Sequence, residues 1–207
     1  MRKLVWNGTG ILGPGQHADA WTEVYSTDNT IPPIVKFDYR TGSTPTLMGF
    51  DDDPDKLVVI TGGGKQMKLV AFWRDEITAG KSKRIVGEIE VKCGMDPLPE
   101  WIQSEQSVVV SRYGAFVVNN MPTTVDPELT DIAPDPVAVN KKPVLQVSLM
   151  GPACLGPLGV ERFEWNPVTH EWKSVWARPD VASNSMVPAH SQSASMALVD
   201  GYYEKDG

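Results

Sequence analysis

The chain has 207 residues, 41% of them hydrophobic and 22% charged, and a formal net charge of −7 at pH 7. These proportions are ordinary for a globular protein, and no apolar run reaches the roughly 18 residues of a membrane-spanning helix, so a membrane span is excluded. The acidic balance argues against nucleic-acid binding, because the largest basic cluster is KSKR at residues 81–84 and phosphate backbones require a basic stripe.

The first 21 residues contain only short apolar pieces broken by glycines. They lack the continuous apolar core of a secretory signal peptide. The compartment stays open, periplasmic and extracellular locations included. His17 and Asp19 lie in this segment, in a glycine-bounded loop just before the first β-rich run.

Short β-rich runs then recur along the chain, and no long stretch has the apolar spacing of an amphipathic helix. Glycine and proline turn signals separate the runs, which predicts an all-β, antiparallel fold. A proline-rich stretch at about residues 121–143 has no clear period and is predicted to be a loop or insertion within a single domain, residues 1–207. The runs cover residues 22–26, 33–39, 56–61, 67–73, 84–91, 107–119, 144–150, 159–165, 172–177 and 194–203.

The sequence Gly62-Gly63-Gly64-Lys65 follows one of these runs, as a phosphate-binding loop would. In the pattern G-x-x-x-x-G-K-[ST], however, the first glycine falls at Val59 and the residue after the lysine is Gln66. A second β-rich run follows instead of a helix. We therefore predict a glycine-rich hairpin turn between two strands.

The acidic run DDDPD at residues 51–55 has the clustered carboxylates that suit calcium. It lacks the spacing and the distal glutamate of an EF-hand loop. We predict an exposed hairpin tip.

The two cysteines, Cys93 and Cys154, have no metal-binding spacing, and the sequence leaves open whether they form a disulfide or stay as buried thiols.

Three segments share one plan: small polar residues, an apolar strand, a tight turn and a second apolar strand. They cover residues 43–62, 104–120 and 190–207. A second theme, a strand followed by a polar turn, precedes two of them at 35–46 and 161–176. Repeated hairpins of this kind indicate a fold assembled from similar β units.

The pattern VKFDYRTGSTPTLMG, followed by KLVVITGGG and MKLVAFWRDE, resembles a blade of the PQQ-like (quinoprotein-type) β-propeller family. The resemblance is best over residues 33–76 and 160–203. It implies a β-propeller-like domain of about four blades, at roughly 40–50 residues each. Such a propeller is incomplete, so we expect the chain to be a fragment or to be completed by another chain. A β-sandwich built from similar hairpins is the structural alternative.

The resemblance implies a binding or scaffold module of bacterial type, with a small-molecule or protein ligand at the loop face. In propellers, the loops that lead into the innermost strands surround the central channel, where ligands bind. Polar residues in such loops are therefore the candidate ligand residues. They are His17, Asp19, Asp28, Asn29, His190 and Gln192.

An enzyme is the alternative function, either a metal-dependent hydrolase or lactonase acting at the propeller mouth or a quinoprotein-like oxidoreductase. Quinoprotein dehydrogenases carry adjacent cysteines, which this chain lacks, so the resemblance is carried over for the fold and not for a quinone cofactor. Three scattered histidines define no metal site, and no cofactor is identified. His170 falls at a turn and is predicted to be a turn residue that tolerates an unusual φ.

Overall fold

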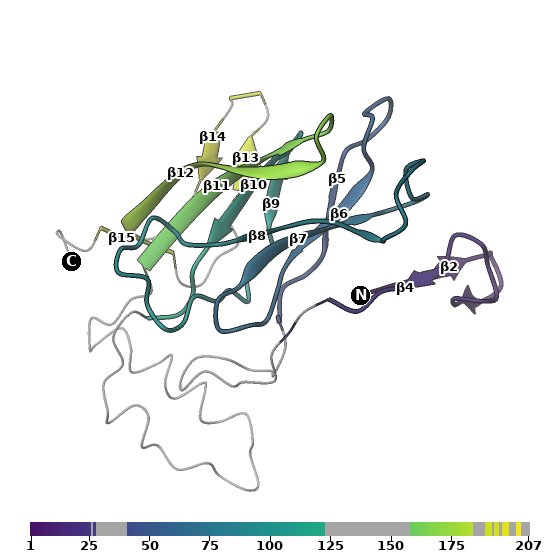
Figure 1. The fold of residues 1–207 in the computed structure, drawn as a ribbon, viewed down its shortest axis with the longest axis horizontal. Coiled ribbons are helices and arrows are strands. Elements are labelled where there is room, and N and C mark those ends of the chain that lie inside the picture. Colours follow the sequence, from purple (N-terminus) through teal and green to yellow (C-terminus); the bar gives the residue numbers. More distant parts are fainter. Residues whose placement is uncertain are drawn as a thin grey trace, which may run out of the picture.

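All the regular structure that the computed structural model describes is β-strand, and every pair of strands in its sheets is antiparallel. This confirms the all-β, antiparallel class (Figure 1). None of the described residues is helical, and accordingly none lies in a helix that could cross a membrane. The description covers residues 1–25, 27, 41–122, 158–183, 189–191, 193–194, 196–198 and 202–203.

The first large sheet is a four-stranded meander in the order β5-β6-β7-β8. Its strands are β5 (Thr46–Met48), β6 (Leu57–Thr61), β7 (Lys68–Trp73) and β8 (Ile85–Glu90). The strands expected at 56–61, 67–73 and 84–91 are thereby confirmed. Gly62 to Lys65 form the turn between β6 and β7, where the Gly62 N–H donates to the Lys68 carbonyl at 2.7 Å. The predicted hairpin turn is confirmed.

The second large sheet has the order β15-β12-β11-β10-β9. Its strands are β9 (Val109–Ser111), β10 (Gly114–Val118), β11 (Leu158–Asn166), β12 (Glu171–Ala182) and β15 (Tyr202–Tyr203). Strands β9 to β12 form a second antiparallel meander, and the proline-rich stretch falls between β10 and β11, mostly outside the described residues. The remaining strands form two-stranded sheets: β1 (Arg2–Lys3) with β4 (Trp21–Thr22), β2 (Val5–Trp6) with β3 (Ile11–Leu12), and β13 (Ala189–Ser191) with β14 (Met196–Leu198).

The main core lies between the two meanders. Buried side chains from both sheets form one cluster, with Trp73 from the first and Phe163 and Trp165 from the second. Gly87 on β8 makes room for Trp165, since a Cβ at this position would lie 2.7 Å from the indole ring. The sheets are stacked in matching order: β5 lies beside β9, and β8 lies beside β12.

The inner strands are buried on both faces. Along β6, Leu57 and Val59 face the main core, whereas Val58 and Ile60 belong to a second cluster on the opposite face. In β10, Ala115 and Val117 face the main core, and Phe116 and Val118 form a third cluster on the far side. A two-layer sandwich would carry polar residues at these second positions. The inner strands therefore contact apolar side chains on both of their faces.

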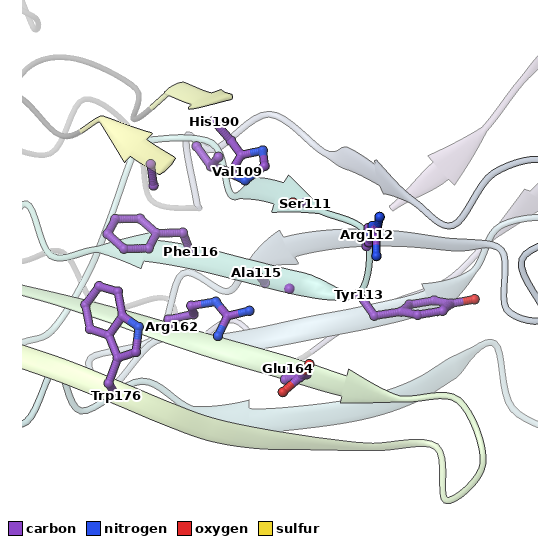
Figure 2. A pocket seen from close by; sticks show the side chains of 12 residues that line it. Val109, Ser111, Arg112, Tyr113, Ala115, Phe116, Arg162, Glu164, Trp176 and His190 are labelled. Carbon is purple, nitrogen blue, oxygen red and sulfur yellow. The ribbon is translucent and has the colours of Figure 1, made fainter. Parts of the chain in front are cut away.

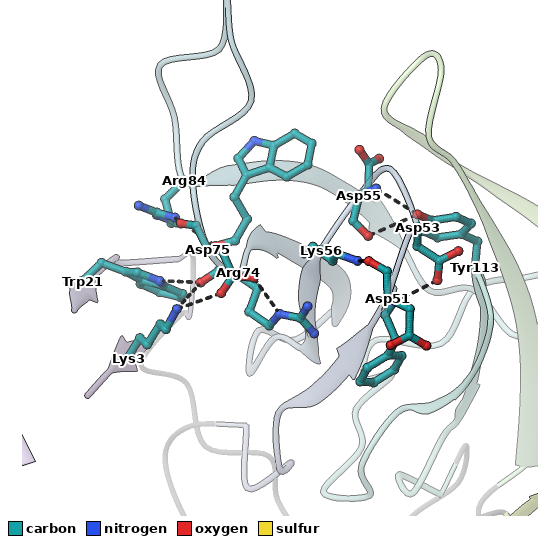
Figure 3. A network of polar contacts seen from close by, with 12 residues as sticks. Lys3, Trp21, Asp51, Asp53, Asp55, Lys56, Arg74, Asp75, Arg84 and Tyr113 are labelled. Carbon is teal, nitrogen blue, oxygen red and sulfur yellow. Dashed lines mark hydrogen bonds and ion pairs between the residues drawn. The ribbon is translucent and has the colours of Figure 1, made fainter. Parts of the chain in front are cut away.

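The N-terminal segment packs against the outer face of the first meander through Trp21, a member of the second cluster. Figure 3 shows Trp21 and Lys3 beside Arg74 and Asp75. The Trp21 ring stacks on Phe72 with centroids 6.1 Å apart, and its indole N–H donates to the Arg74 carbonyl at 3.0 Å. Beside it, the Lys3 ammonium donates to the Asp75 carboxylate at 2.9 Å. Apolar stacking and one ion pair thus hold this segment against β7.

The Lys3–Asp75 ion pair should make the docking of this segment depend on pH. Partial burial raises the pKa of Asp75, but hydrogen bonds and charge from Lys3 and Arg74 outweigh it, and the pKa falls below its ordinary value of 3.8. A lowered carboxyl pKa stabilises the folded state above the unfolded pKa, and this contribution is lost as the pH falls through the folded pKa. We therefore expect Lys3→Met to destabilise the protein at pH 7 and to destabilise it less at pH 3. Urea unfolding at both pH values checks this, with Lys83→Met as the control; an undiminished difference at pH 3 would contradict it.

A buried carboxylate joins the two sheets near β8. Glu161 on β11 is 4% exposed. Its Oε2 accepts the backbone N–H groups of Lys92 at 2.8 Å and Cys93 at 2.7 Å, and its Oε1 accepts the Ser174 hydroxyl at 2.6 Å. Three donors satisfy the charge, so Glu161 fixes the chain after β8 against the second meander.

Cys93 is a free, buried thiol, and Cys154 lies outside the described residues. Burial, followed by the negative charge of Glu161, raises the pKa of the Cys93 thiol far above its ordinary range. Because the thiolate is the reactive species, we expect the Cys154→Ser variant, which retains only Cys93, to resist iodoacetamide at pH 8 while folded and to react in denaturant. Mass spectrometry of the adduct measures this. Rapid labelling of the folded protein would contradict the buried position.

The residues of the acidic run at 51–55 differ in their exposure to solvent. Asp51 to Pro54 are exposed, as predicted, but Asp55 is 3% exposed, so the expectation of an exposed tip is wrong for this residue. Its Oδ2 accepts the Trp165 indole N–H at 2.7 Å, and its backbone exchanges two hydrogen bonds with the Tyr113 hydroxyl. His170, whose φ of 56° confirms the turn prediction, lies with its Nε2 3.6 Å from Asp55 Oδ1.

Candidate functional site

An open cleft of about 740 Å³ lies on the face of the second meander that points away from the first (Figure 2). Strands β9, β10, β11 and β12 form its floor, and the β13–β14 hairpin, which lies beside β9, contributes its other side. The chemistry-bearing side chains that line it are Ser111, Arg112, Arg162, Glu164, Trp176 and His190.

The apolar part of the cleft comes from a row of residues across three strands. Phe116 on β10 pairs with Arg162 on β11, and Arg162 pairs with Trp176 on β12. The two aromatic rings meet edge to face, with centroids 5.4 Å apart. Trp176 remains 42% exposed, so the cleft presents an aromatic surface to solvent.

The polar part lies two residue pairs further along β10 and β11. Gly114 on β10 is opposite Glu164, and a Cβ on Gly114 would lie 3.2 Å from Arg162 Nη2. The missing side chain therefore leaves space for the guanidinium. Within the described part of the chain, no hydrogen bond or ion pair engages the side chains of Arg112, Arg162 or Glu164.

The β9–β10 turn holds Arg112 at the edge of the cleft. Arg112 adopts a φ of 51°, in the left-handed region. The next residue, Tyr113, projects away from the cleft and binds Asp55 of the first meander through its hydroxyl (Figures 2 and 3). This anchor fixes the turn, while Arg112 stays exposed.

Three of the six candidate residues from the sequence are described by the structure, and His190 lies on a different element from the other two. His190 lies on β13 and lines the cleft. His17 and Asp19 lie in the N-terminal segment, between β3 and β4. There the His17 Nδ1 accepts the Asp19 backbone N–H at 3.1 Å. Asp28, Asn29 and Gln192 lie outside the described residues.

The sequence did not identify the charged floor of the cleft. Arg162 and Glu164 alternate with the aromatic residues Phe163 and Trp165 in the strand GVERFEW, so two charges fall on the face opposite to the aromatic side chains. That alternation is the signal that could have singled them out.

Within the residues that the structure describes, no group of three or more His, Cys, Asp or Glu side chains is placed to hold a metal ion.

Comparison with known proteins gives a relative without an assigned activity. No protein-family model matches the chain, and no solved structure matches it. A protein of Archaeoglobus fulgidus, described as uncharacterized, is 32% identical over 166 residues. The match covers 77% of this chain and 30% of the relative, so the chain spans less than a third of that protein's length.

Proposed function

We propose that the chain is a β-propeller-type binding or scaffold module with PQQ-like repeats, in which β5–β8 and β9–β12 are consecutive blades and β13–β14 begin the next. A propeller blade is a four-stranded antiparallel sheet, and the blades are arranged around a central channel. The first sheet has this form, and the second has it in β9 to β12, with β15 added beside β12. The ligand or partner would bind in the cleft between the second blade and the third.

One observation carries the proposal: the first strands of successive units lie side by side. Strand β9 lies beside both β5 and β13, and the outer strands β8 and β12 also lie beside each other. The segments leading into β5 and β9 run in the same direction, since Thr44 N–H donates to Ser107 Oγ at 3.3 Å and Thr46 Oγ1 donates to the Val108 carbonyl at 2.8 Å. Equivalent first strands that are adjacent and parallel are what a shared central axis requires.

Burial on both faces supports the same proposal. The alternating residues of β6 and β10 reach separate cores on their two faces, as the inner strands of stacked blades do. Strand β12, which would be an outer strand, is mostly exposed along its length. A closed ring needs more sheets than these, supplied by further chain or by other copies.

The arrangement is tested by a crystal or cryo-electron microscopy structure of the assembled protein. We expect further four-stranded sheets stacked on the open face of the second meander, with β5, β9 and β13 around one channel. A closed two-layer sandwich with solvent on both outer faces would contradict the propeller and leave the β-sandwich.

The binding role is tested separately by thermal shift. Sugars, amino acids, organic acids, nucleotides and divalent metal ions form the panel. We expect at least one class to raise the Tm of the wild type and to lose this effect in His190→Ala. An unchanged shift in that variant, or no shift from any class, would contradict binding in the cleft. Stoichiometric metal binding lost on replacing His190 and Asp28 would instead favour the metal-dependent enzyme.

A further inference from the structure

We propose that the cleft over β9–β12 binds a small organic carboxylate with a planar apolar body, a ligand class that rests on the proposed binding function of this cleft. The carboxylate lies on the guanidinium of Arg162, and the planar body lies against Trp176 and Phe116. The inference follows from the charge, the pairing and the shape of the residues in Figure 2.

The charge of the cleft is opposite to that of the chain. The protein carries a net charge of −7, yet two arginines line the cleft against one glutamate. Arg162 is partly buried on the sheet, and its guanidinium has no hydrogen-bond partner within the described residues. A partly desolvated guanidinium is stabilised by an anion that accepts its parallel N–H donors, and a carboxylate matches that geometry.

The surroundings of Arg162 provide the rest of the site. Gly114 leaves room for the guanidinium on the sheet, and Ser111, its partner in register on β9, lines the cleft with a hydroxyl donor. The edge-to-face pair of Phe116 and Trp176 flanks the strand that carries Arg162. A ligand whose carboxylate lies on Arg162 therefore places its body against an aromatic surface.

Glu164 decides between a carboxylate and a phosphate. It lies two residues from Arg162 on the same face of β11 and lines the same cleft. Two arginines and this one glutamate line the cleft, so a monoanionic carboxylate balances the excess of positive charge, whereas a dianionic phosphate exceeds it and leaves a negative charge beside Glu164. The site therefore selects a single negative charge.

The experiment is isothermal titration calorimetry at low ionic strength with three ligands: benzoate, its neutral isostere benzamide, and phenyl phosphate. We expect the wild type to bind benzoate in preference to both others. Arg162→Met should weaken benzoate binding by about tenfold or more, because it removes a group that makes charge-assisted hydrogen bonds. Glu164→Gln should tighten it by about two- to fivefold through removal of a like charge. Arg178→Ala, on β12 but outside the lining, is the matched control and should leave the affinity unchanged.

Each outcome decides the question. Equal binding of benzamide and benzoate, stronger binding of phenyl phosphate, or weaker benzoate binding in Glu164→Gln would overturn the carboxylate inference. Since Glu164 is exposed, its near-isosteric variant stays informative even if Arg162→Met fails to fold. If a neutral or cationic class of compound raises the Tm in the thermal-shift panel and this effect depends on His190, only the carboxylate inference is refuted. If no class of compound binds, the proposed function is refuted as well.

Discussion

Replacing Gly49 with alanine should lower the free energy of unfolding by about 3 kcal/mol, the sum of left-handed backbone strain and a steric clash. Gly49 directly follows β5 and adopts a φ of 76°. A Cβ at this position would lie 1.8 Å from the backbone carbonyl oxygen of Asp55. That oxygen belongs to the main chain, so relief requires movement of the loop that positions Asp55 against the second meander. Guanidinium unfolding followed by circular dichroism measures the loss.

Gly80→Ala separates the two contributions. Gly80 has nearly the same backbone conformation, with a φ of 82°, but nothing lies within 4 Å of its added Cβ. It should therefore cost only the strain of a left-handed alanine, about 1 kcal/mol. Equal losses for the two variants would show that the contact with Asp55 contributes nothing.

Features set by neighbouring residues were predictable from the sequence. The apolar, β-branched runs that became β6 and β7 predicted strands, and the glycines between them predicted a turn. The same runs have no polar alternation, which is the signature of strands buried on both faces. The positive φ of His170 also followed from its place in a turn. Local sequence was sufficient in each case because the determining contacts are local.

Features set by distant residues were not predictable. Asp55 belongs to an acidic run, and its carboxylate is buried against the indole of Trp165, 110 residues further along the chain. The cleft depends likewise on which face of the second meander stays open and on where β13 lies. Of the six candidate residues, His190 lines this cleft, whereas Arg162 was overlooked because a charge on a strand usually faces solvent.

Asp55→Ala should destabilise the protein by about 3 kcal/mol, because it leaves a buried donor without an acceptor. Trp165 is 1% exposed, and Asp55 accepts its indole N–H. Asp55→Asn, which keeps one side-chain oxygen, should lose less. Asp52→Ala is the control from the same acidic run: Asp52 is exposed, and its replacement should change the unfolding free energy by less than about 0.5 kcal/mol.

A double-mutant cycle shows whether the loss arises from this one contact. Trp165→Phe removes the N–H and retains an aromatic ring in the core between the sheets. In the Trp165→Phe background, replacing Asp55 with alanine leaves no indole N–H without an acceptor. The loss of unfolding free energy in the double variant should therefore be about 1–2 kcal/mol smaller than the sum of the two single losses. Urea unfolding of the four proteins gives the coupling. Strict additivity would mean that the Asp55 carboxylate acts through another neighbour, such as His170, whose Nε2 lies 3.6 Å from Asp55 Oδ1, and that the indole contributes little to holding the two meanders together.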